Sequence, residues 1–376
     1  MRVSLGVVAK ESRETINGSK NGLPIVGLEH LIPGEISLTA WDIDCENTFT
    51  KTFRKGQILF GRRRAYLKKA AVAPFDGICS GDITLIEALP DKLLPELLPF
   101  IIQNDTFFDY AVGKSAGSLS PRVKWEHLQN FEFELPPLSE QRKLADLLWA
   151  ANSARESYKK VVLATDELVK SRFVEMFGDP DNNVHGWELL TIRDVVTDVR
   201  YGTSKPAVDG GEYTYLRMNN ITYDGLLDLS DTKRINIPDA ELHKCTVRQG
   251  DILFNRTNSR ELVGKTCVFD MSTPMVIAGY IIRVRLNARV ISEYLSTTLN
   301  TDTYKKLLRQ ICKGAIGQAN INAQEFQDIR ILVPPIELQN MFLTLLKTAD
   351  KSKFLKLLQP AAQTSFLMKG GLRYAA

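Results

Sequence analysis

The sequence predicts an α+β fold: two similar α+β domains separated by two long helices, which pack as an antiparallel coiled coil. Three observations predict this architecture. Short landmarks recur at a nearly constant offset, a long segment without Gly or Pro follows the first set, and a similar segment follows the second. With 44% hydrophobic and 24% charged residues, the chain can build sizeable cores, and a disordered chain, a collagen and a coiled-coil rod are excluded.

An internal repeat underlies the prediction of two domains. KGQILF at 55–60 returns as QGDILF at 249–254, and LPPL at 135–138 returns as VPPI at 333–336, offsets of 250 − 56 = 194 and 334 − 136 = 198. Between these landmarks, GKSAG at 113–117 is echoed by CKGAIG at 312–317. This period exceeds that of solenoid repeats and indicates a duplicated domain with its connector, with coincidence of common dipeptides as the alternative.

Short mixed patterns within each half predict the α+β class. Strands are expected at 57–60, 82–87, 131–135, 251–254, 280–286 and 329–333. Short helices are expected at 95–108 and 292–309.

The first connector is predicted to be one long helix, Ser139–Phe177. Ser139 is a good N-cap, Gly178 and Pro180 end the helix, and no Gly or Pro lies between. At a rise of about 1.5 Å per residue the helix would be about 58 Å long. Spacings of three and four define a heptad seam for a second helix, formed by Leu144, Leu147, Ala151, Ala154, Tyr158, Val161, Thr165 and Leu168.

The second connector begins after Pro335 and carries Phe342, Leu345 and Ala349 at equivalent positions. Pro360 must end or kink it, and a shorter helical piece is expected at 363–369. Because each connector has an apolar stripe that needs a partner, we expect the two to pack together, antiparallel. The expected boundaries are 1–137 and 179–335 for the domains, 138–178 for the first connector and 336–376 for the second.

Apolar residues outside this seam predict a docking surface. Leu148, Trp149, Val162 and Val169 lie on the first connector but not in the heptad pattern. Exposed apolar surface marks interaction sites, so we expect these four residues to dock a partner subunit.

Composition and hydrophobic segments also indicate where in the cell the protein is found. The formal charge of +4 is too small an excess to indicate a partner by itself. The five cysteines are scattered without a C-x-x-C pair, which fits reduced thiols better than disulfides or a zinc site. No secretory signal begins the chain, and no apolar run approaches the roughly 20 residues of a membrane span. We therefore expect a soluble, cytoplasmic protein with no membrane partner.

Nucleotide and metal motifs are missing. There is no G-x-G-x-x-G after a strand, no G-x-x-x-x-G-K-[ST] and no H-E-x-x-H. The four histidines are far apart, which favours surface or packing positions over metal ligation. The pattern predicts a chain that is not an enzyme, with no catalytic residue, no metal and no cofactor of its own.

The strongest surface signal is basic. Residues 54–69 read RKGQILFGRRRAYLKK, with seven basic residues and no acid. Such groups after a strand can contact phosphates or guanine edges, and a solvated basic loop is the alternative. The candidate DNA contacts here are Arg62, Arg63, Arg64, Tyr66, Lys68 and Lys69.

The repeat favours the DNA interpretation. In the second half the equivalent strand is followed by NRTNSR at 255–260. Two modules that read different sequences would show different polar side chains at the same scaffold position. The candidates there are Asn255, Arg256, Asn258 and Arg260.

A second loop in each half, GKSAGSLSPR at 113–122 and KGAIGQANIN at 313–322, is rich in glycine and small polar residues. Its N–H groups and hydroxyls could hold phosphates, while a flexible connection is equally consistent with the pattern. The candidates in these loops are Lys114, Ser118, Ser120, Arg122, Lys313, Gln318 and Asn320. Weaker candidates in the second half are Tyr201, Lys205, Arg217, Asn219 and Asn220.

Four further segments are informative together: PPLSEQRKLADLL at 136–148, CSGDI at 79–83, GDILFNR at 250–256 and the Trp187-Glu188-Leu189 entry to the second half. With these segments, the chain resembles, over essentially its whole length, the specificity subunit of type I restriction–modification systems. The first half lacks a matching Trp-Glu entry, and Pro360 interrupts the second helix.

This resemblance implies a function in defence against foreign DNA. Each half would be a target recognition domain that reads one part of a split, asymmetric site in double-stranded DNA. The paired helices would fix the spacing and dock two methyltransferase subunits, and ATP-dependent restriction subunits would join the complex. S-adenosylmethionine, ATP and Mg would bind to those partners and not to this chain.

Two alternatives come from other classes. A self-contained DNA methyltransferase would require a cofactor site, which binding of S-adenosylmethionine by the purified chain would reveal. A two-domain scaffold without DNA binding would show no loss of salt-dependent DNA affinity when Arg62, Arg63 and Arg64 are neutralised.

Overall fold

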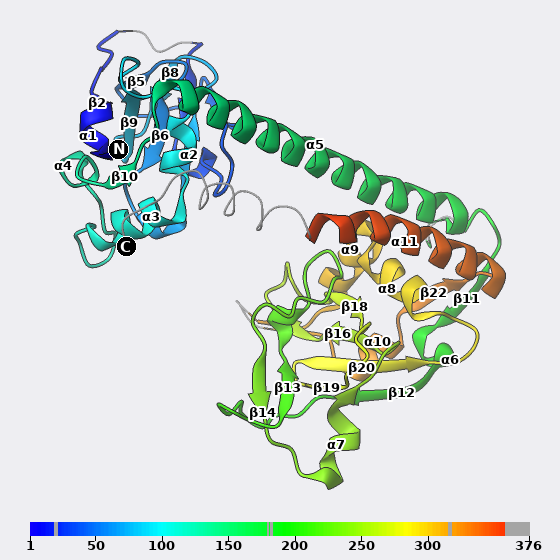
Figure 1. Cartoon of the computed structure of the whole chain (residues 1–376). Coiled ribbons are helices and arrows are strands. Elements are labelled where there is room, and N and C mark those ends of the chain that lie inside the picture. The colour runs from blue at the N-terminus through cyan, green and yellow to red at the C-terminus, as the bar shows by residue number, and fades with distance from the viewer. Residues whose placement is uncertain (19–21, 179, 181–182, 315–317, 358–376) are drawn as a thin grey trace. The chain divides into compact units, whose positions relative to one another are not determined.

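The computed structural model of the chain describes residues 1–18, 22–178, 180, 183–314 and 318–357. The chain divides into two compact units, one built on Met1–Val161 and the other on Val162–Lys353, which we call unit 1 and unit 2 (Figure 1). The division falls inside the long helix, so each unit contains a globular domain and part of that helix. Pro360 and the helical piece expected at 363–369 lie outside the described residues.

Unit 1 contains two four-stranded sheets. The first is antiparallel and has, in sheet order, the strands β2 (Ala9–Ser12), β9 (Ile83–Ala88), β6 (Ile58–Gly61) and β7 (Ala70–Val72). The second has β4 (Asp42–Ile43), β3 (Pro24–Val26), β8 (Gly77–Cys79) and β5 (Lys51–Phe53), and only its β3–β8 pair is parallel.

Unit 2 repeats both sheets in the same order. The first has β12 (Val196–Tyr201), β20 (Ile281–Leu286), β16 (Ile252–Asn255) and β18 (Thr266–Val268). The second has β14 (Lys233–Ile235), β13 (Tyr213–Leu216), β19 (Met275–Ile277) and β15 (Thr246–Val247), again with one parallel pair, β13–β19. The predicted duplication is therefore confirmed strand by strand.

A small two-stranded sheet joins the start of each domain to its last strand. It pairs β1 (Arg2–Ser4) with β10 (Glu132–Glu134) in unit 1, and β11 (Glu188–Thr191) with β22 (Arg330–Val333) in unit 2. The connector helix follows this last strand, so both connectors leave from equivalent places. All six predicted strands lie on observed ones.

Short helices cover the sheets in matching positions. They are α1 (Leu5–Val8), α2 (Leu98–Ile102), α3 (Asp105–Gly113) and α4 (Trp125–Leu128) in unit 1, and α6 (Ile192–Val195), α8 (Ser292–Asn300), α9 (Asp302–Ile311) and α10 (Ala323–Gln327) in unit 2. Each helix expected as one piece, 95–108 and 292–309, is two. The side chains of Asn104 and Thr301 accept hydrogen bonds from N–H groups of the next helix, and these caps start a new helix where a continuous one was predicted.

The repeated glycine explains why the hexapeptide recurs. Gly56 and Gly250 have φ of 89° and 91°, in the left-handed region that a side chain disfavours. Each turns the chain into the central strand, β6 or β16, whose Ile-Leu-Phe triplet is buried. Phe60 stacks on Phe108 and Phe254 packs on Phe326, so the same triplet anchors the core of both units.

The first connector is helix α5 (Leu138–Phe177), close to the predicted span. Its seam lies in a different register from the one predicted. Ala145 and Leu148 are buried in unit 1, whereas Phe173 and Phe177 are buried in unit 2. Leu147 and Leu168 of the predicted seam are exposed.

The second connector is helix α11 (Ile336–Leu357), which runs antiparallel to the part of α5 that belongs to unit 2 (Figure 1). The ring of Phe342 lies 5.1 Å from that of Phe173 and 5.6 Å from that of Phe177, centroid to centroid. Leu345 and Ala349 pack against the same core. The pairing and the three predicted residues of the second connector are confirmed for unit 2.

Three of the four residues predicted to dock a partner pack inside their own units. Leu148 is 1% exposed and Val169 is buried. Trp149 packs its ring 5.3 Å from that of Phe100, and its Nε1 donates to the carbonyl of Glu96 at 2.9 Å. These side chains pack against the cores beneath α5, which covers much of their apolar surface, and Trp149 and Val162 stay half-exposed.

A buried glutamine fixes each connector to its domain. Gln141 Oε1 accepts from Leu94 N, and its Nε2 donates to the carbonyls of Lys92 and Pro136. Gln339 repeats this pattern with the N–H of Ile291 and the carbonyls of Arg289 and Pro334. Both amides satisfy backbone groups that would otherwise be buried and unpaired.

Candidate nucleic-acid interface

In unit 1 the structure brings the two predicted polar loops together. The loop after β6 and the loop before α4 form a short antiparallel bridge between Arg63 and Arg122. Arg64 N donates to Pro121 O at 2.8 Å and Val123 N donates to Arg62 O at 3.0 Å. Arg63 also donates to the hydroxyl of Ser120 at 3.1 Å. The segment 113–122 is therefore held against the basic loop and is not a free connection.

One carboxylate that the sequence analysis missed lies at this junction. Asp82 accepts from Arg122 Nε at 2.7 Å, and its second oxygen lies 3.6 Å from Arg63 Nη1. The hydrogen bond from Arg122, followed by the nearby arginine charges, lowers the pKa of Asp82. Asp82 thus neutralises part of the positive charge of this surface. Its position in the CSGDI segment, just before a strand, is the feature of the sequence that could have predicted this contact.

The accessible part of this surface is basic with apolar tips. Arg64 is exposed and its backbone is left-handed, with φ of 55°. Arg62 is half-buried, and its Nε is buried without a hydrogen-bond partner. Tyr66 is exposed, and Leu119 at the tip of the second loop is 90% exposed. Arginines beside an exposed aromatic ring offer charge and stacking surface to a nucleic acid.

The three lysines of unit 1 that were predicted to contact DNA are less available. Lys68 pairs with Asp105 at 2.6 Å, and the ammonium of Lys114 lies 5.7 Å from the ring centre of Tyr110. Lys69 Nζ donates to the carbonyl of Leu28 at 2.6 Å. Lys69 therefore has a structural partner inside the domain.

Unit 2 builds the same junction with different side chains. Strand β17 (Thr257–Asn258) pairs with β21 (Ala319–Asn320), and Ile321 N donates to Arg256 O at 2.9 Å. Arg256 donates to Asn320 Oδ1 at 3.1 Å. Its guanidinium lies 4.7 Å from the ring centre of Tyr201, whose hydroxyl accepts from Ala323 N. Tyr201, Arg256 and Asn320, predicted from separate segments, converge.

Burial removes two predicted contacts of unit 2 from this interface. Asn255 is 0% exposed, donates to Thr257 O and accepts from Asn258 Nδ2 at 3.0 Å. Asn220 is 2% exposed and accepts from Arg217 N while donating to Asp228 O. Both amides shape turns, a role that polar side chains at strand ends often have.

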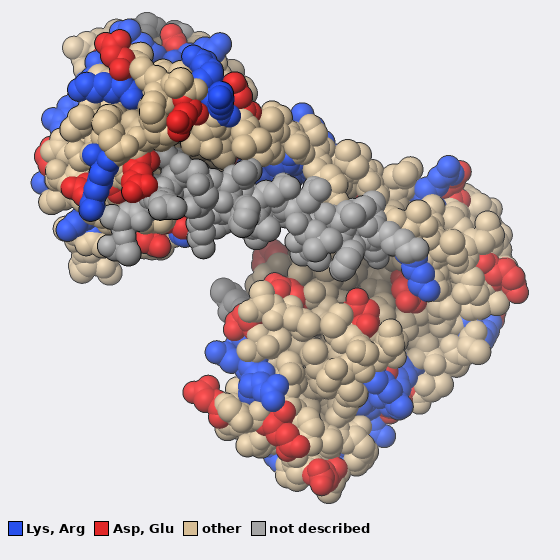
Figure 2. All heavy atoms as spheres, in the orientation of Figure 1, with Lys and Arg blue, Asp and Glu red and all other residues tan. Residues whose placement is uncertain are grey.

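The remaining candidates of unit 2 divide by charge pairing. Three are held by carboxylates: Lys205 by Glu241 at 3.0 Å, Arg217 by Asp231 at 2.7 Å, and Lys313 by Glu325 at 2.6 Å. Asn219, Arg260 and Gln318 are exposed, as is Ser118 in unit 1. The face visible in Figure 2 likewise carries Lys and Arg on both units with Asp and Glu among them, so the basic patches are local.

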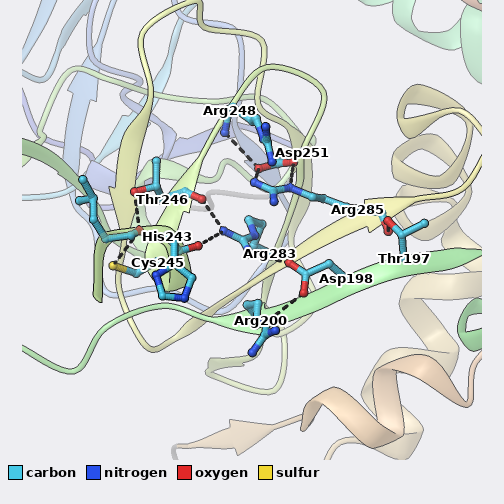
Figure 3. A network of polar contacts seen from close by, with 11 residues as sticks. Thr197, Asp198, Arg200, His243, Cys245, Thr246, Arg248, Asp251, Arg283 and Arg285 are labelled. Atoms are coloured by element: carbon cyan, nitrogen blue, oxygen red, sulfur yellow. Dashed lines mark hydrogen bonds and ion pairs between the residues drawn. The ribbon is translucent and has the colours of Figure 1, made fainter. Parts of the chain in front are cut away.

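A buried ion-pair network supports the sheet of unit 2 (Figure 3). Arg283 of β20 is 2% exposed and donates to Asp198 of β12 at 2.5 Å and to the carbonyls of Thr246 and His243. Those carbonyls end helix α7 (Asp239–Cys245), which has no counterpart among the described residues of unit 1. At the position of Arg283, unit 1 has Leu85 in an apolar core.

GKSAG at 113–117 has the spacing of a hydrolase nucleophile, G-x-S-x-G, but not its geometry. The nucleophile requires a sharp turn from a strand into a helix, whereas Ser115 follows the end of α3. Its hydroxyl donates to Ala111 O at 2.8 Å. Ser115 is thus part of a helix terminus.

Among the described residues, no cluster of three His, Cys, Asp or Glu side chains could hold a metal ion. No helix in the described part of the chain combines the length and apolar character that a membrane span needs.

The family model that matches is the type I restriction modification DNA specificity domain, over residues 185–358. A putative type I restriction enzyme MjaX specificity subunit of Methanocaldococcus jannaschii is 27% identical over 44% of this chain and 39% of its own length. The type I restriction enzyme EcoKI specificity subunit of Escherichia coli K12 is 23% identical over 60% of this chain and 52% of its own length. The matches thus span about half of these relatives or less.

Two solved structures share the fold over nearly the whole chain. The type I restriction–modification S subunit from M. genitalium superposes with a TM-score of 0.58 at 12% identity, covering 98% of this chain and 95% of that one. A chain from a type I R-M system, solved to explain complex assembly, gives 0.52 at 20% identity, covering 98% and 94%. Residues 185–358 thus match the type I restriction modification DNA specificity domain, and the chain shares its fold, over nearly its whole length, with two chains of type I restriction–modification systems.

Proposed function

We propose that this chain is the non-catalytic, sequence-specific DNA-binding subunit of a type I restriction–modification complex, each unit reading one part of a bipartite, asymmetric site. One observation carries the proposal: the two units share a scaffold but offer different side chains at the same junction. Unit 1 presents Arg63 and Arg64, and unit 2 presents Asn258 and Arg260. Guanidinium forks suit guanine and amides suit adenine, so the units would read different bases.

The helices would dock two methyltransferase subunits, and restriction subunits would join through the complex. Leu147, Leu163 and Leu168 of α5 are exposed, and exposed apolar side chains on a helix fit a protein partner better than the buried residues first expected. S-adenosylmethionine, ATP and Mg would bind to those partners. The complex would act in the cytoplasm.

Helix α5 would also set the distance between the half-sites. It has 40 residues, which at about 1.5 Å per residue gives a length of about 60 Å. Its two ends are built into different units by Leu148 and Phe173, so its length is coupled to both.

Selection from duplexes with a randomised centre tests the proposal, with the full chain coexpressed with its methyltransferase subunits. We expect two enriched blocks of sequence at a fixed gap, and binding that weakens steeply with salt. Absence of any enriched sequence would favour the scaffold alternative. S-adenosylmethionine binding to the purified chain alone would favour a self-contained methyltransferase.

A further inference from the structure

The two copies can be compared position by position along the basic loop. Between residues 55–72 and 249–268, the strand register aligns the copies with one two-residue insertion. The residues shared between the copies are Gly56/Gly250, Ile58/Ile252, Leu59/Leu253, Phe60/Phe254, Arg62/Arg256, Lys69/Lys265 and Val72/Val268. Each shared residue should have a physical cause that is the same in both units.

Most shared residues have such a cause inside the chain. The glycines have positive φ, and the Ile-Leu-Phe triplets are buried. The lysines have the same partner in both units: Lys69 Nζ donates to the carbonyl of Leu28, and Lys265 Nζ to that of Met218 at 2.8 Å. Leu28 and Met218 open equivalent 3-10 turns, η1 (Leu28–His30) and η4 (Met218–Asn220).

The shared arginine has the same backbone in both units. Arg62 N donates to Asp82 O, and Arg256 N donates to Tyr280 O at 3.0 Å. Their carbonyls accept from Val123 and Ile321, which lie at equivalent positions. Both side chains therefore start from the same point at the end of the central strand.

Their side-chain surroundings are not shared. Arg256 rests on Tyr201 and donates to Asn320. In unit 1 the register puts Arg13, paired with Glu11 and Glu126, in the place of Tyr201, and Arg122, paired with Asp82, in the place of Asn320. The side chain of Arg62 makes no hydrogen bond or ion pair with any described residue. No contact among the described residues accounts for arginine in both copies.

A partner that is the same for both halves would supply a common cause. In DNA the phosphates are alike at every base pair, whereas base edges differ between half-sites. We propose that Arg62 and Arg256 are equivalent phosphate contacts that fix the register of each unit on the duplex, and that base reading belongs to residues that differ, among them Arg64 and Arg260. This rests on the proposed DNA-binding function, and it separates the arginines that position the protein from those that specify the sequence.

The test replaces the shared arginines in the full chain, coexpressed with its methyltransferase subunits. Arg62→Gln, Arg256→Gln and the double variant are titrated against a duplex selected by the wild type and against randomised duplex at several salt concentrations. Each single change should make the slope of log K against log salt shallower by about 0.9, and the double change by about 1.8. Affinity for both duplexes should fall by the same factor, and the sequences selected should be unchanged.

Arg64→Gln and Arg260→Gln are matched controls that remove the same charge at positions that differ between the copies. Arg62→Lys, which keeps the point charge for a phosphate, should restore the salt slope and guards against a folding defect in Arg62→Gln. A change of selected bases in one half-site with Arg62→Gln or Arg256→Gln, or an unchanged salt slope, overturns the phosphate role. A wild-type complex that selects no sequence overturns the proposed function itself.

Discussion

Asp82 determines how much of the positive charge near β6 is free. Its carboxylate holds Arg122 and lies near Arg63, so Asp82→Asn should release both guanidiniums. We predict tighter binding to randomised duplex and a salt slope steeper by about 1–2, measured by titration at several salt concentrations. Asp109→Asn removes the same charge from an exposed position outside the junction, and an equal effect there would contradict the prediction.

The direction of the Asp82 pKa shift sets the pH range of this pairing. Hydrogen bonding from Arg122 lowers the pKa of Asp82 below 3.8, so the stabilisation is present above that value and is lost as pH falls through the folded-state pKa. Wild type and Asp82→Asn should therefore differ in stability at neutral pH and converge in strong acid. Denaturant unfolding at several pH values measures this difference.

The buried Arg283 is predicted to stabilise unit 2. Arg283→Met would leave Asp198 and two backbone carbonyls without their buried partner, so the free energy of unfolding of unit 2 should fall by about 3–5 kcal/mol. Arg200 also binds Asp198 but is exposed, and Arg200→Met should cost less than about 1 kcal/mol. Denaturant unfolding compares the two variants, and equal losses would show that the buried network contributes no more than a surface pair.

The polar residues that the sequence indicates as DNA contacts differ in where their side chains point. Arg63, Ser120 and Arg122 were identified by composition, and they do converge. Asn255 and Lys69 belong to the same polar runs, yet their side chains turn inward to Asn258 and to the carbonyl of Leu28. Those partners depend on how distant segments fold, which a local pattern of polar residues does not encode.

The predicted register of the α5 seam is wrong because the helix carries two overlapping apolar stripes. Leu147-Leu148-Trp149 and Leu168-Val169 offer two adjacent stripes with spacings of three and four. The heptad spacing predicted that the stripe containing Leu147 is the buried one, whereas the structure buries Leu148 and Val169. Two overlapping stripes cannot be separated without knowing where each domain lies around the helix.

Gln339 is predicted to stabilise the attachment of α11 to its domain. Gln339→Met keeps the size of the side chain but leaves Ile291 N–H and the carbonyls of Arg289 and Pro334 unpaired. The free energy of unfolding of unit 2 should fall by about 1–3 kcal/mol in denaturant titrations, because buried backbone groups lose their partners. Asn340→Met on the exposed neighbouring position should change it by less than about 0.5 kcal/mol. Equal losses of unfolding free energy in the two variants would contradict an anchoring role for Gln339.

At the scale of the whole molecule, the duplication was predictable because a glycine with positive φ, a buried triplet and a Pro-Pro pair recur in the sequence. The extra helix α7 was not predicted, because it occurs in one copy only and its support, Arg283, reads as an ordinary surface charge within a strand.

A four-residue insertion between Val161 and Val162 tests the proposed spacing role. This site lies at the boundary of the two units and leaves Arg155 and Lys159 in their contacts with Gly34 and Glu35 of unit 1. The insertion adds about 6 Å and about 40° of rotation, so the preferred gap should grow by one or two base pairs. Sequencing of modified DNA measures the gap, and an unchanged gap with full activity would leave α5 as a docking surface only.

The most direct measurement is the set of methylated sites in cells that express the chain with its methyltransferase subunits, for wild type, Arg64→Gln and Arg260→Gln. We predict a motif in two blocks for the wild type, with Arg64→Gln relaxing bases in one block and Arg260→Gln relaxing bases in the other. A motif in a single block, or a variant that alters both blocks equally, would contradict independent reading by the two units.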